Sequence, residues 1–202
     1  KGKYIGTVTT KDTSVEQLRA MMVGHDVNFH VVKGPANPGD VVLDVEHLTV
    51  ASKLHKKNAV RDVSLQVRKG EIVCIAGIDG NGQTELVYGL TGLEPVVSGK
   101  ITLCGQDITH MPIRKRNILG MSHIPEDRHK HGLVLDYSLE DNLVLERYFE
   151  PEFTSKAGFL RRDNIRKYAE RLIDEYDIRS GQGPVTMARS MSGGNQQKAI
   201  VA

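Results

Sequence analysis

The sequence has little net charge, few cysteines and no long apolar run. Its 27 Lys and Arg residues face 25 Asp and Glu residues, which leaves a formal charge of +2. This balance excludes a strongly basic nucleic-acid-binding protein and an acidic disordered tail. The longest apolar run of note, Ile72–Ile78, spans about seven residues, whereas a membrane helix needs about 20. The sequence therefore predicts no membrane-spanning helix.

The cysteines and the start of the chain also limit the class of protein. Cys74 and Cys104 lie in apolar, strand-like runs without metal-ligand spacing. We expect two buried, reduced thiols of a cytosolic protein rather than a disulfide. The chain begins Lys1-Gly2-Lys3 without a signal peptide, so we expect it to be a piece of a longer protein.

The composition is that of a globular protein with one sizeable core, or of one domain plus a fragment. Hydrophobic residues make up 39% of the chain, and a chain of this length buries about 70% of its unfolded surface. The segment from Gly34 to Gly39 contains two prolines and two glycines, which is typical of a linker. We therefore place a domain boundary near Pro38.

Periodicity predicts a β-rich first part and a helical last part. Alternation or a short apolar run predicts strands over 4–9, 41–50, 59–67, 71–77, 98–104 and 120–124, and the run at 71–77 is typical of a buried strand. Helical spacing predicts helices over 84–93, 113–118 and 139–148, from Asp163, and from Ser192 to Ala202. A capping box of Thr13 and Glu16 predicts one earlier helix, which we expect to end at Gly24.

A glycine-rich segment joins the expected strand over 71–77 to the expected helix over 84–93. It runs Gly77-Ile78-Asp79-Gly80-Asn81-Gly82-Gln83-Thr84. It fits the phosphate-loop pattern G-x-x-x-x-G-K-[ST] except at Gln83, where the pattern has Lys. Glycines let consecutive backbone N–H groups turn around phosphate oxygens, and the helix start adds partial positive charge. Thr84 keeps the hydroxyl that can bind Mg²⁺, so the segment predicts a nucleotide site.

The departure at Gln83 predicts weakened nucleotide binding. Gln83 brings no charge where Lys would bring one, and Glu85 adds a carboxylate in the first turn of the helix. A unit charge at about 4 Å is worth up to about 4 kcal/mol at an effective dielectric constant of about 20. Glu85 could instead point to solvent and stabilise the helix N-terminus. A glycine-rich turn without a ligand is the alternative to a degenerate nucleotide loop.

A second anion-binding feature stands near the C-terminus. Met191-Ser192-Gly193-Gly194-Asn195-Gln196 opens the last expected helix. Ser-Gly-Gly at a helix start exposes several N–H groups and a hydroxyl. By itself the segment could be an ordinary helix cap, but its place after a phosphate loop and a helical block is far more specific.

The two motifs resemble those of an ATP-binding cassette (ABC) domain. Gly77–Thr84 resembles the Walker A motif, and Ser192-Gly193-Gly194-Asn195-Gln196 resembles the ABC signature. Glu126, within His123-Ile124-Pro125-Glu126-Asp127-Arg128, stands where the Q-loop of the family has glutamine. The resemblance covers essentially the whole chain. It implies an α/β, ABC-type nucleotide-binding domain with an antiparallel β subdomain, a P-loop RecA-like core and an α-helical subdomain, truncated after the signature helix.

The chain resembles one branch of this family, the second cassette of double-cassette ATPases that power importers of simple sugars and nucleosides. The resemblance implies that residues 1–37 are the C-terminal tail of the preceding cassette plus a linker. Residues 38–202 would be the N-terminal two-thirds of the second cassette, with the helical subdomain at about 127–190. In such ATPases two cassettes sandwich two ATP molecules, each between one Walker A motif and the other signature. The signature of this chain would then act in trans on ATP held by the first cassette, beside its own degenerate Walker A site.

The resemblance also implies ligands, site residues and partners. ATP would contact Gly77, Asp79, Gly80, Asn81, Gly82, Gln83, Thr84, Glu85, Ser192, Gly193, Gly194, Asn195 and Gln196, with Mg²⁺ on Thr84. No catalytic residue is expected, since those of the family lie past the signature, and the chain alone should not hydrolyse ATP. Expected partners are the first cassette of the same polypeptide, membrane permease subunits and, indirectly, an extracellular substrate-binding protein. The expected location is the cytoplasmic face of the cell membrane. Nucleic acid is not expected among the partners.

Two other classes of protein stay open. One is a soluble ABC ATPase module outside transport, against which the near-neutral charge argues. The other is a dinucleotide-cofactor-binding domain, suggested by the loose pattern G-x-x-G-x-G but lacking an acidic residue about 20 residues further on. The expected hairpin tip, 53–57, has no aromatic residue to stack on adenine. The basic cluster Arg128–His131 is either a docking site for membrane subunits or a solvated loop.

Overall fold

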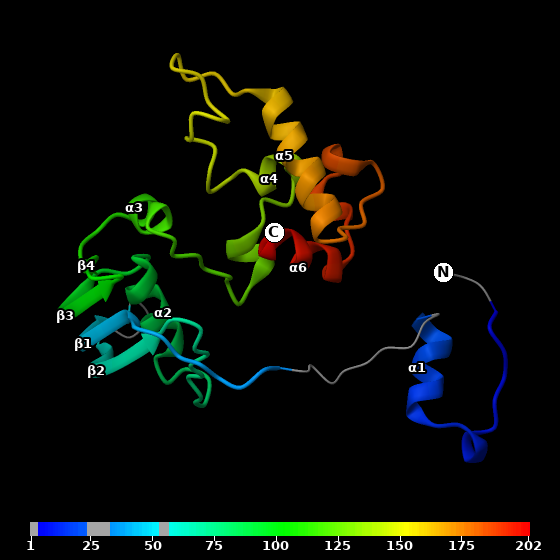
Figure 1. Ribbon diagram of the computed structural model, residues 1–202, viewed down its shortest axis with the longest axis horizontal. Coiled ribbons are helices and arrows are strands. Elements are labelled where there is room, and N and C mark those ends of the chain that lie inside the picture. The colour runs from blue at the N-terminus through cyan, green and yellow to red at the C-terminus, as the bar shows by residue number, and fades with distance from the viewer. Residues whose placement is uncertain (1–3, 24–32, 53–56) are drawn as a thin grey trace.

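A four-stranded antiparallel sheet and a group of helices make up most of the described structure (Figure 1). The computed structural model describes residues 4–23, 33–52 and 57–202. In chain order the elements are η1 (Thr10–Asp12), α1 (Val15–Val23), β1 (Val41–Ala51), β2 (Asn58–Arg68), α2 (Gln83–Thr91), β3 (Val96–Leu103), β4 (Gln106–Asp107), α3 (Ile113–Ile118), η2 (Arg128–Gly132), α4 (Leu139–Leu143), α5 (Arg162–Glu175), η3 (Gly183–Val185), η4 (Ala188–Ser190) and α6 (Gly193–Val201).

The sheet has the strand order β2-β1-β3-β4, and each neighbouring pair is antiparallel. In the central strand β1, Val45 is opposite Leu65 of β2 and Ile101 of β3. Strands β1, β2 and β3 confirm three of the predicted strands, with small shifts at their ends. Each of them contributes buried side chains to one core: Val45, Leu48 and Val50 from β1, Val60 from β2 and Ile101 from β3.

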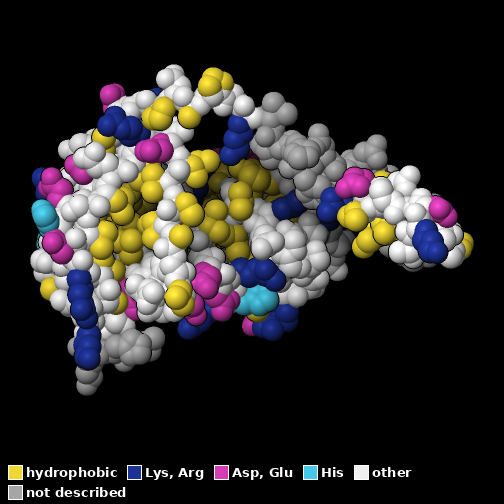
Figure 2. Space-filling model, turned by 90° about the horizontal axis from the view of Figure 1, so that it is seen from below, with side chains coloured by type: hydrophobic (Ala, Val, Ile, Leu, Met, Phe, Trp, Pro, Cys, Tyr) yellow, Lys and Arg dark blue, Asp and Glu magenta, His cyan; other side chains and the backbone are white. Residues whose placement is uncertain are grey.

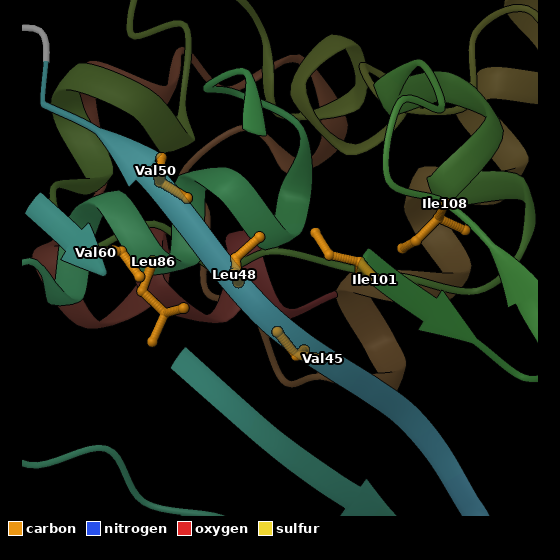
Figure 3. Close-up of a cluster of buried hydrophobic side chains, with 7 residues drawn as sticks. All are labelled: Val45, Leu48, Val50, Val60, Leu86, Ile101 and Ile108. Atoms are coloured by element: carbon orange, nitrogen blue, oxygen red, sulfur yellow. The ribbon is translucent and has the colours of Figure 1, made fainter. Parts of the chain in front are cut away.

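The main core packs helix α2 against this sheet (Figure 3). The cluster consists of Val45, Leu48, Val50, Val60, Leu86, Ile101 and Ile108, and none of these side chains is more than 6% exposed. Full burial of one such side chain is worth about 1.5–3 kcal/mol. Because Leu86 lies near the start of α2, this core fixes the helix end that follows the glycine-rich loop.

The helical part, around α4, α5 and α6 (Figure 1), has two hydrophobic clusters of its own. Ile165, Tyr168, Ala169 and Leu172 form the buried face of α5, as the spacing predicts. Ion pairs from α5 to α4, Arg166–Glu140 and Arg162–Asp141, hold the two helices together. No helix in the described ranges has the length and hydrophobicity that crossing a membrane requires.

Three of the predicted strands are wrong. Residues 4–9, 71–77 and 120–124 form no strand, and Ile72, expected to be buried, is 84% exposed. A buried strand needs neighbouring strands to pair its N–H and C=O groups, and no strand of the described residues pairs with 71–77. One face of the molecule shows hydrophobic side chains in a hollow (Figure 2).

Several local predictions also need correction. The capping box is formed one residue later than predicted: the Gln17 N–H donates to Ser14 Oγ (3.2 Å) and the Ser14 N–H to Gln17 Oε1 (3.0 Å). The helix predicted over 139–148 ends at Leu143, and Asp163 lies in the first turn of α5 rather than at its cap. The predicted helix end at Gly24 and most of the predicted hairpin tip lie outside the described residues.

The prediction for the two thiols is half right. Cys74 and Cys104 are free, as expected, but both are exposed. Cys74 lies in the segment that forms no strand, and Cys104 lies in a turn at φ 48° that follows β3. Both residues were expected inside strands, but the segment around Cys74 forms no strand and Cys104 lies just past the end of β3.

Candidate functional site

The predicted phosphate loop lies at the N-terminus of α2. Gly82 is the N-cap of this helix and lies in the left-handed region at φ 96°. A Cβ at Gly82 would lie 2.8 Å from the carbonyl oxygen of Ala59 on β2. The position therefore requires glycine both for its backbone angle and for space, and the loop ends in contact with the sheet.

A pocket of about 450 Å³ opens at this loop, a volume within the usual range for small-molecule sites. It is lined by Ser52, Lys57, Asn58, Ala59, Arg61, Asp79, Gly80, Asn81, Gly82, Gln83, Thr84 and Glu85. The structure thus brings together every residue of the loop that was predicted to contact ATP, except Gly77. The hairpin β1–β2 adds residues that the sequence did not indicate, among them the cations Lys57 and Arg61 and the buried hydroxyl of Ser52, which has no hydrogen-bond partner among the described residues.

Gln83 turns back into the loop instead of extending outward. Its Nε2 donates to the carbonyl oxygen of Ile78 at 3.1 Å. A Cβ at Gly77 would lie only 2.1 Å from the same nitrogen, so the amide occupies the space that Gly77 leaves. Gln83 therefore braces the base of the loop through one of the two N–H donors of its amide.

Thr84 is the residue at which the loop could hold a metal ion. It is exposed in the first turn of α2 and lines the pocket. No group of three His, Cys, Asp or Glu side chains in the described ranges could hold a metal ion. Mg²⁺ is commonly bound by one or two protein ligands together with phosphate oxygens and water, so a single hydroxyl beside bound phosphates fits this ion.

The predicted signature lies at the N-terminus of α6, with Ser192 as its N-cap. Asn195 Nδ2 donates to Ser192 Oγ at 2.9 Å, and Asn195 Oδ1 accepts from the Arg179 N–H at 2.8 Å. The first N–H groups of a helix have no partner inside it. Ser192 and Gly194 are exposed at this end, which therefore presents N–H groups and a hydroxyl suited to an anion.

Gln196 faces away from that exposed end. Its side chain is 5% exposed, its Nε2 donates to the carbonyl oxygen of Ala188 at 2.9 Å, and its Oε1 lies 2.9 Å from His129 Nε2. The structure thus places Ser192, Gly193, Gly194 and Asn195 at the helix end and Gln196 in the interior. Gln196 therefore anchors α6 rather than facing a ligand, and no local pattern in the sequence distinguishes these two roles.

Among the described residues, the pocket at the loop is lined by no residue of the signature. The residues that line the loop pocket all come from 52–85. Helix α2 lies in the β-rich part and α6 with the other helices (Figure 1). Each motif is therefore presented by a different part of the molecule.

Glu126 is exposed in a bend just before η2, a single turn of π-helix. The next residue, Asp127, caps this turn: its Oδ1 accepts from the backbone N–H groups of Lys130 at 3.1 Å and His129 at 2.9 Å. These two bonds hold the pKa of Asp127 below its usual range, and the bond from Lys130 has the larger effect. The carboxylate therefore stabilises the turn only while it is ionised.

We expect η2 to loosen in acid. A depressed pKa in the folded chain means that the stabilisation is complete above the unfolded value of about 3.9 and is lost as pH falls through the lower, folded pKa. The backbone amide resonances of His129 and Lys130 should therefore shift together in an NMR titration below about pH 4. In Asp127→Asn this step should vanish, and a step that persists there would contradict the assignment to Asp127.

Comparison with known proteins matches residues 60–202 to a family model described as ABC transporter. The guanosine import ATP-binding protein NupO of Bacillus subtilis (strain 168) is 46% identical over 201 residues, covering 100% of this chain and 39% of its own length. The nucleoside import ATP-binding protein NupA of Lactococcus lactis subsp. cremoris (strain MG1363) is 46% identical over 202 residues, covering 100% of this chain and 39% of its own length. The chain thus spans 39% of the length of these curated relatives.

A solved structure shows the same fold. The crystal structure of an ATP-binding cassette of an ABC transporter in its ADP conformation aligns with a TM-score of 0.58 at 16% identity, covering 80% of this chain and 63% of that chain. The matched residues of the family model include both the loop before α2 and the exposed end of α6.

Proposed function

This chain belongs to the ABC transporter family, and we propose that it is part of the ATP-binding subunit of an importer for a simple sugar or a nucleoside. The ATPase domain of this family binds ATP. The observation that carries the proposal is the pairing of a glycine-lined pocket before α2 with a free Ser-Gly-Gly helix end at α6. NupO and NupA, with 46% identity, make a nucleoside the first substrate to test.

In this proposal the loop before α2 is a degenerate nucleotide site. Backbone N–H groups of Gly80–Thr84 would surround the phosphates, and Mg²⁺ would sit on Thr84. The neutral Gln83, whose amide is bonded to Ile78, supplies no cation. Lys57 and Arg61 at the pocket wall would offset part of that missing charge.

The signature would act in trans, on ATP held by another cassette. Two observations support this: α6 contributes no residue to the loop pocket, and its N-terminal end is exposed. We further propose that the chain is the second of two cassettes, with the tail of the first plus a linker at residues 1–37 and its own cassette at 38–202. The helical part at about 127–190 would be its helical subdomain.

The partners and the location follow from the same proposal. The chain would work with the first cassette of the same polypeptide and with membrane permease subunits at the cytoplasmic face of the cell membrane, and indirectly with an extracellular substrate-binding protein. No catalytic residue for ATP hydrolysis is assigned to it, and no nucleic acid is among its partners. Co-purification with permease subunits, followed by uptake of a labelled nucleoside or sugar, tests this; ATP binding without any permease partner would favour a soluble ABC module.

Thr84→Ala is expected to lower the affinity for Mg-ATP about tenfold, because a contact with a charged group is lost. Affinity for ATP in excess chelator should not change, since the hydroxyl is proposed to act through the metal ion. Equilibrium titration with a fluorescent ATP analogue measures both values. Thr91→Ala, at the other end of α2, is the matched control because Thr91 bonds only to its own helix. An equal loss in both variants, or an equal loss without Mg²⁺, contradicts the metal assignment.

A further inference from the structure

The π-helix η2 packs along one face of the signature helix α6. A Cβ at Gly193, in the first turn of α6, would lie 2.9 Å from Arg128 Nη2. Further along, a Cβ at Gly132 would lie 2.8 Å from Ile200 Cδ1. Positions 193, 196 and 200 share one face of an α-helix, so η2 follows α6 from its exposed end inward.

The polar contact in this packing joins His129 to Gln196. Gln196 Nε2 donates to the carbonyl oxygen of Ala188, which only accepts, so Gln196 Oε1 is the atom that faces His129 at 2.9 Å. Since an amide oxygen also only accepts, His129 Nε2 must carry the proton. Arg128 Nε lies 3.4 Å from the same nitrogen, but a protonated nitrogen cannot accept a hydrogen bond from it. We assign the proton to Nε2 because the contact with Gln196 is the shorter of the two.

Burial makes this hydrogen bond more costly to lose than a surface bond. Gln196 is 5% exposed, and a buried acceptor left without a donor carries its full desolvation cost. The π-helical turn that carries His129 is stabilised in turn, because Asp127 accepts hydrogen bonds from the N–H groups of His129 and Lys130. Single turns of π-helix are rare in proteins, and those that occur are often found at functional sites.

We infer that His129 is a positioning residue for the signature. Through Gln196 it fixes α6 against the segment that follows Glu126, and so sets the direction in which Ser192 and Gly194 are presented. The binding of nucleotide at this helix end rests on the proposed function. The contact between His129 and Gln196 does not depend on it. The basic cluster Arg128–His131 thus acquires a role toward the inside of the molecule, in addition to the alternatives that its sequence left open.

Three variants of the complete protein test the inference. His129→Ala should speed backbone hydrogen exchange at 196–199 about tenfold, because these N–H groups are bonded within α6 and the helix loses its anchor. His129→Gln should restore the wild-type rate, since the glutamine Nε2 reaches about as far as the imidazole Nε2 and also donates. Lys130→Ala, an exposed neighbour on the same turn, is the matched control and should exchange as wild type. Equal exchange in His129→Ala and Lys130→Ala would overturn the inference.

A second readout separates this inference from the proposed function. ATP hydrolysis by the assembled transporter should fall about tenfold in His129→Ala and recover in His129→Gln, while ATP affinity at the loop stays unchanged. If Ser192→Arg abolishes hydrolysis but His129→Ala does not lower it, the positioning role is wrong and the proposed function stands. If Ser192→Arg has no effect, the proposed function is wrong, and hydrogen exchange alone decides the positioning role.

Discussion

Ser192→Arg is expected to abolish ATP hydrolysis by the assembled transporter, with a loss of about 100-fold or more, as when a donor to the developing charge is removed from an active site. Ser192 caps α6 beside N–H groups that have no partner inside the helix. An arginine side chain would remove the hydroxyl and fill the space through which a phosphate must approach these groups. Gln83→Ala should leave much of the activity, because Gln83 carries no charge and its amide is bonded to Ile78 inside the loop. Phosphate release at saturating ATP measures both variants.

Ser190→Arg is the matched control for this substitution. Ser190 is exposed two residues before the cap, and its hydroxyl donates to the carbonyl oxygen of Met187 rather than toward the helix end. It should keep near-wild-type hydrolysis. ATP binding at the loop should survive in Ser192→Arg, since α6 does not line that pocket. If Gln83→Ala proves more damaging than Ser192→Arg, the proposed roles of the two motifs are reversed.

Both halves of the candidate site could be predicted because their signals are local. The start of α2 follows from glycines that allow a tight turn before an amphipathic segment, and the start of α6 follows from a serine cap. The strand over 59–67 was predictable for a similar reason, since this run alternates over its own length and forms most of β2. In each case the neighbouring residues along the chain suffice to specify the element.

Features that depend on distant residues could not be predicted in this way. The apolar run over 71–77 has the composition of a buried strand, but burial requires strand partners, and the described sheet supplies none. Arg61 and Ser52 enter the loop pocket only because the hairpin β1–β2 folds over it. His129 and Gln196 are brought together by the packing of η2 on α6, and no spacing in the sequence indicates that pair.

Arg116 is another residue whose role only the fold reveals. It is 2% exposed and donates to the carbonyl oxygens of Leu90 at 2.6 Å, Met111 at 2.8 Å, Thr109 at 3.0 Å and Gly89 at 3.4 Å. Gly89 and Leu90 belong to the last turn of α2, where the helix dipole favours a cation. Burial lowers the pKa of the Arg116 guanidinium, yet arginine stays charged in proteins. One buried cation thus joins α2, α3 and the segment between β4 and α3.

Arg116→Met should therefore lower the free energy of unfolding by about 4 kcal/mol, because several buried carbonyl groups lose their donor at once. Arg116→Lys should lose about 2 kcal/mol, since an ammonium keeps the charge but cannot reach all four carbonyl groups on the two segments. Chemical denaturation followed by circular dichroism measures both losses. Lys115→Met, an exposed change on the same helix, should stay within about 0.5 kcal/mol of wild type. If Arg116→Met loses no more than Lys115→Met, the guanidinium is not what holds the end of α2, and the core around Leu86 alone must fix the helix that carries the loop.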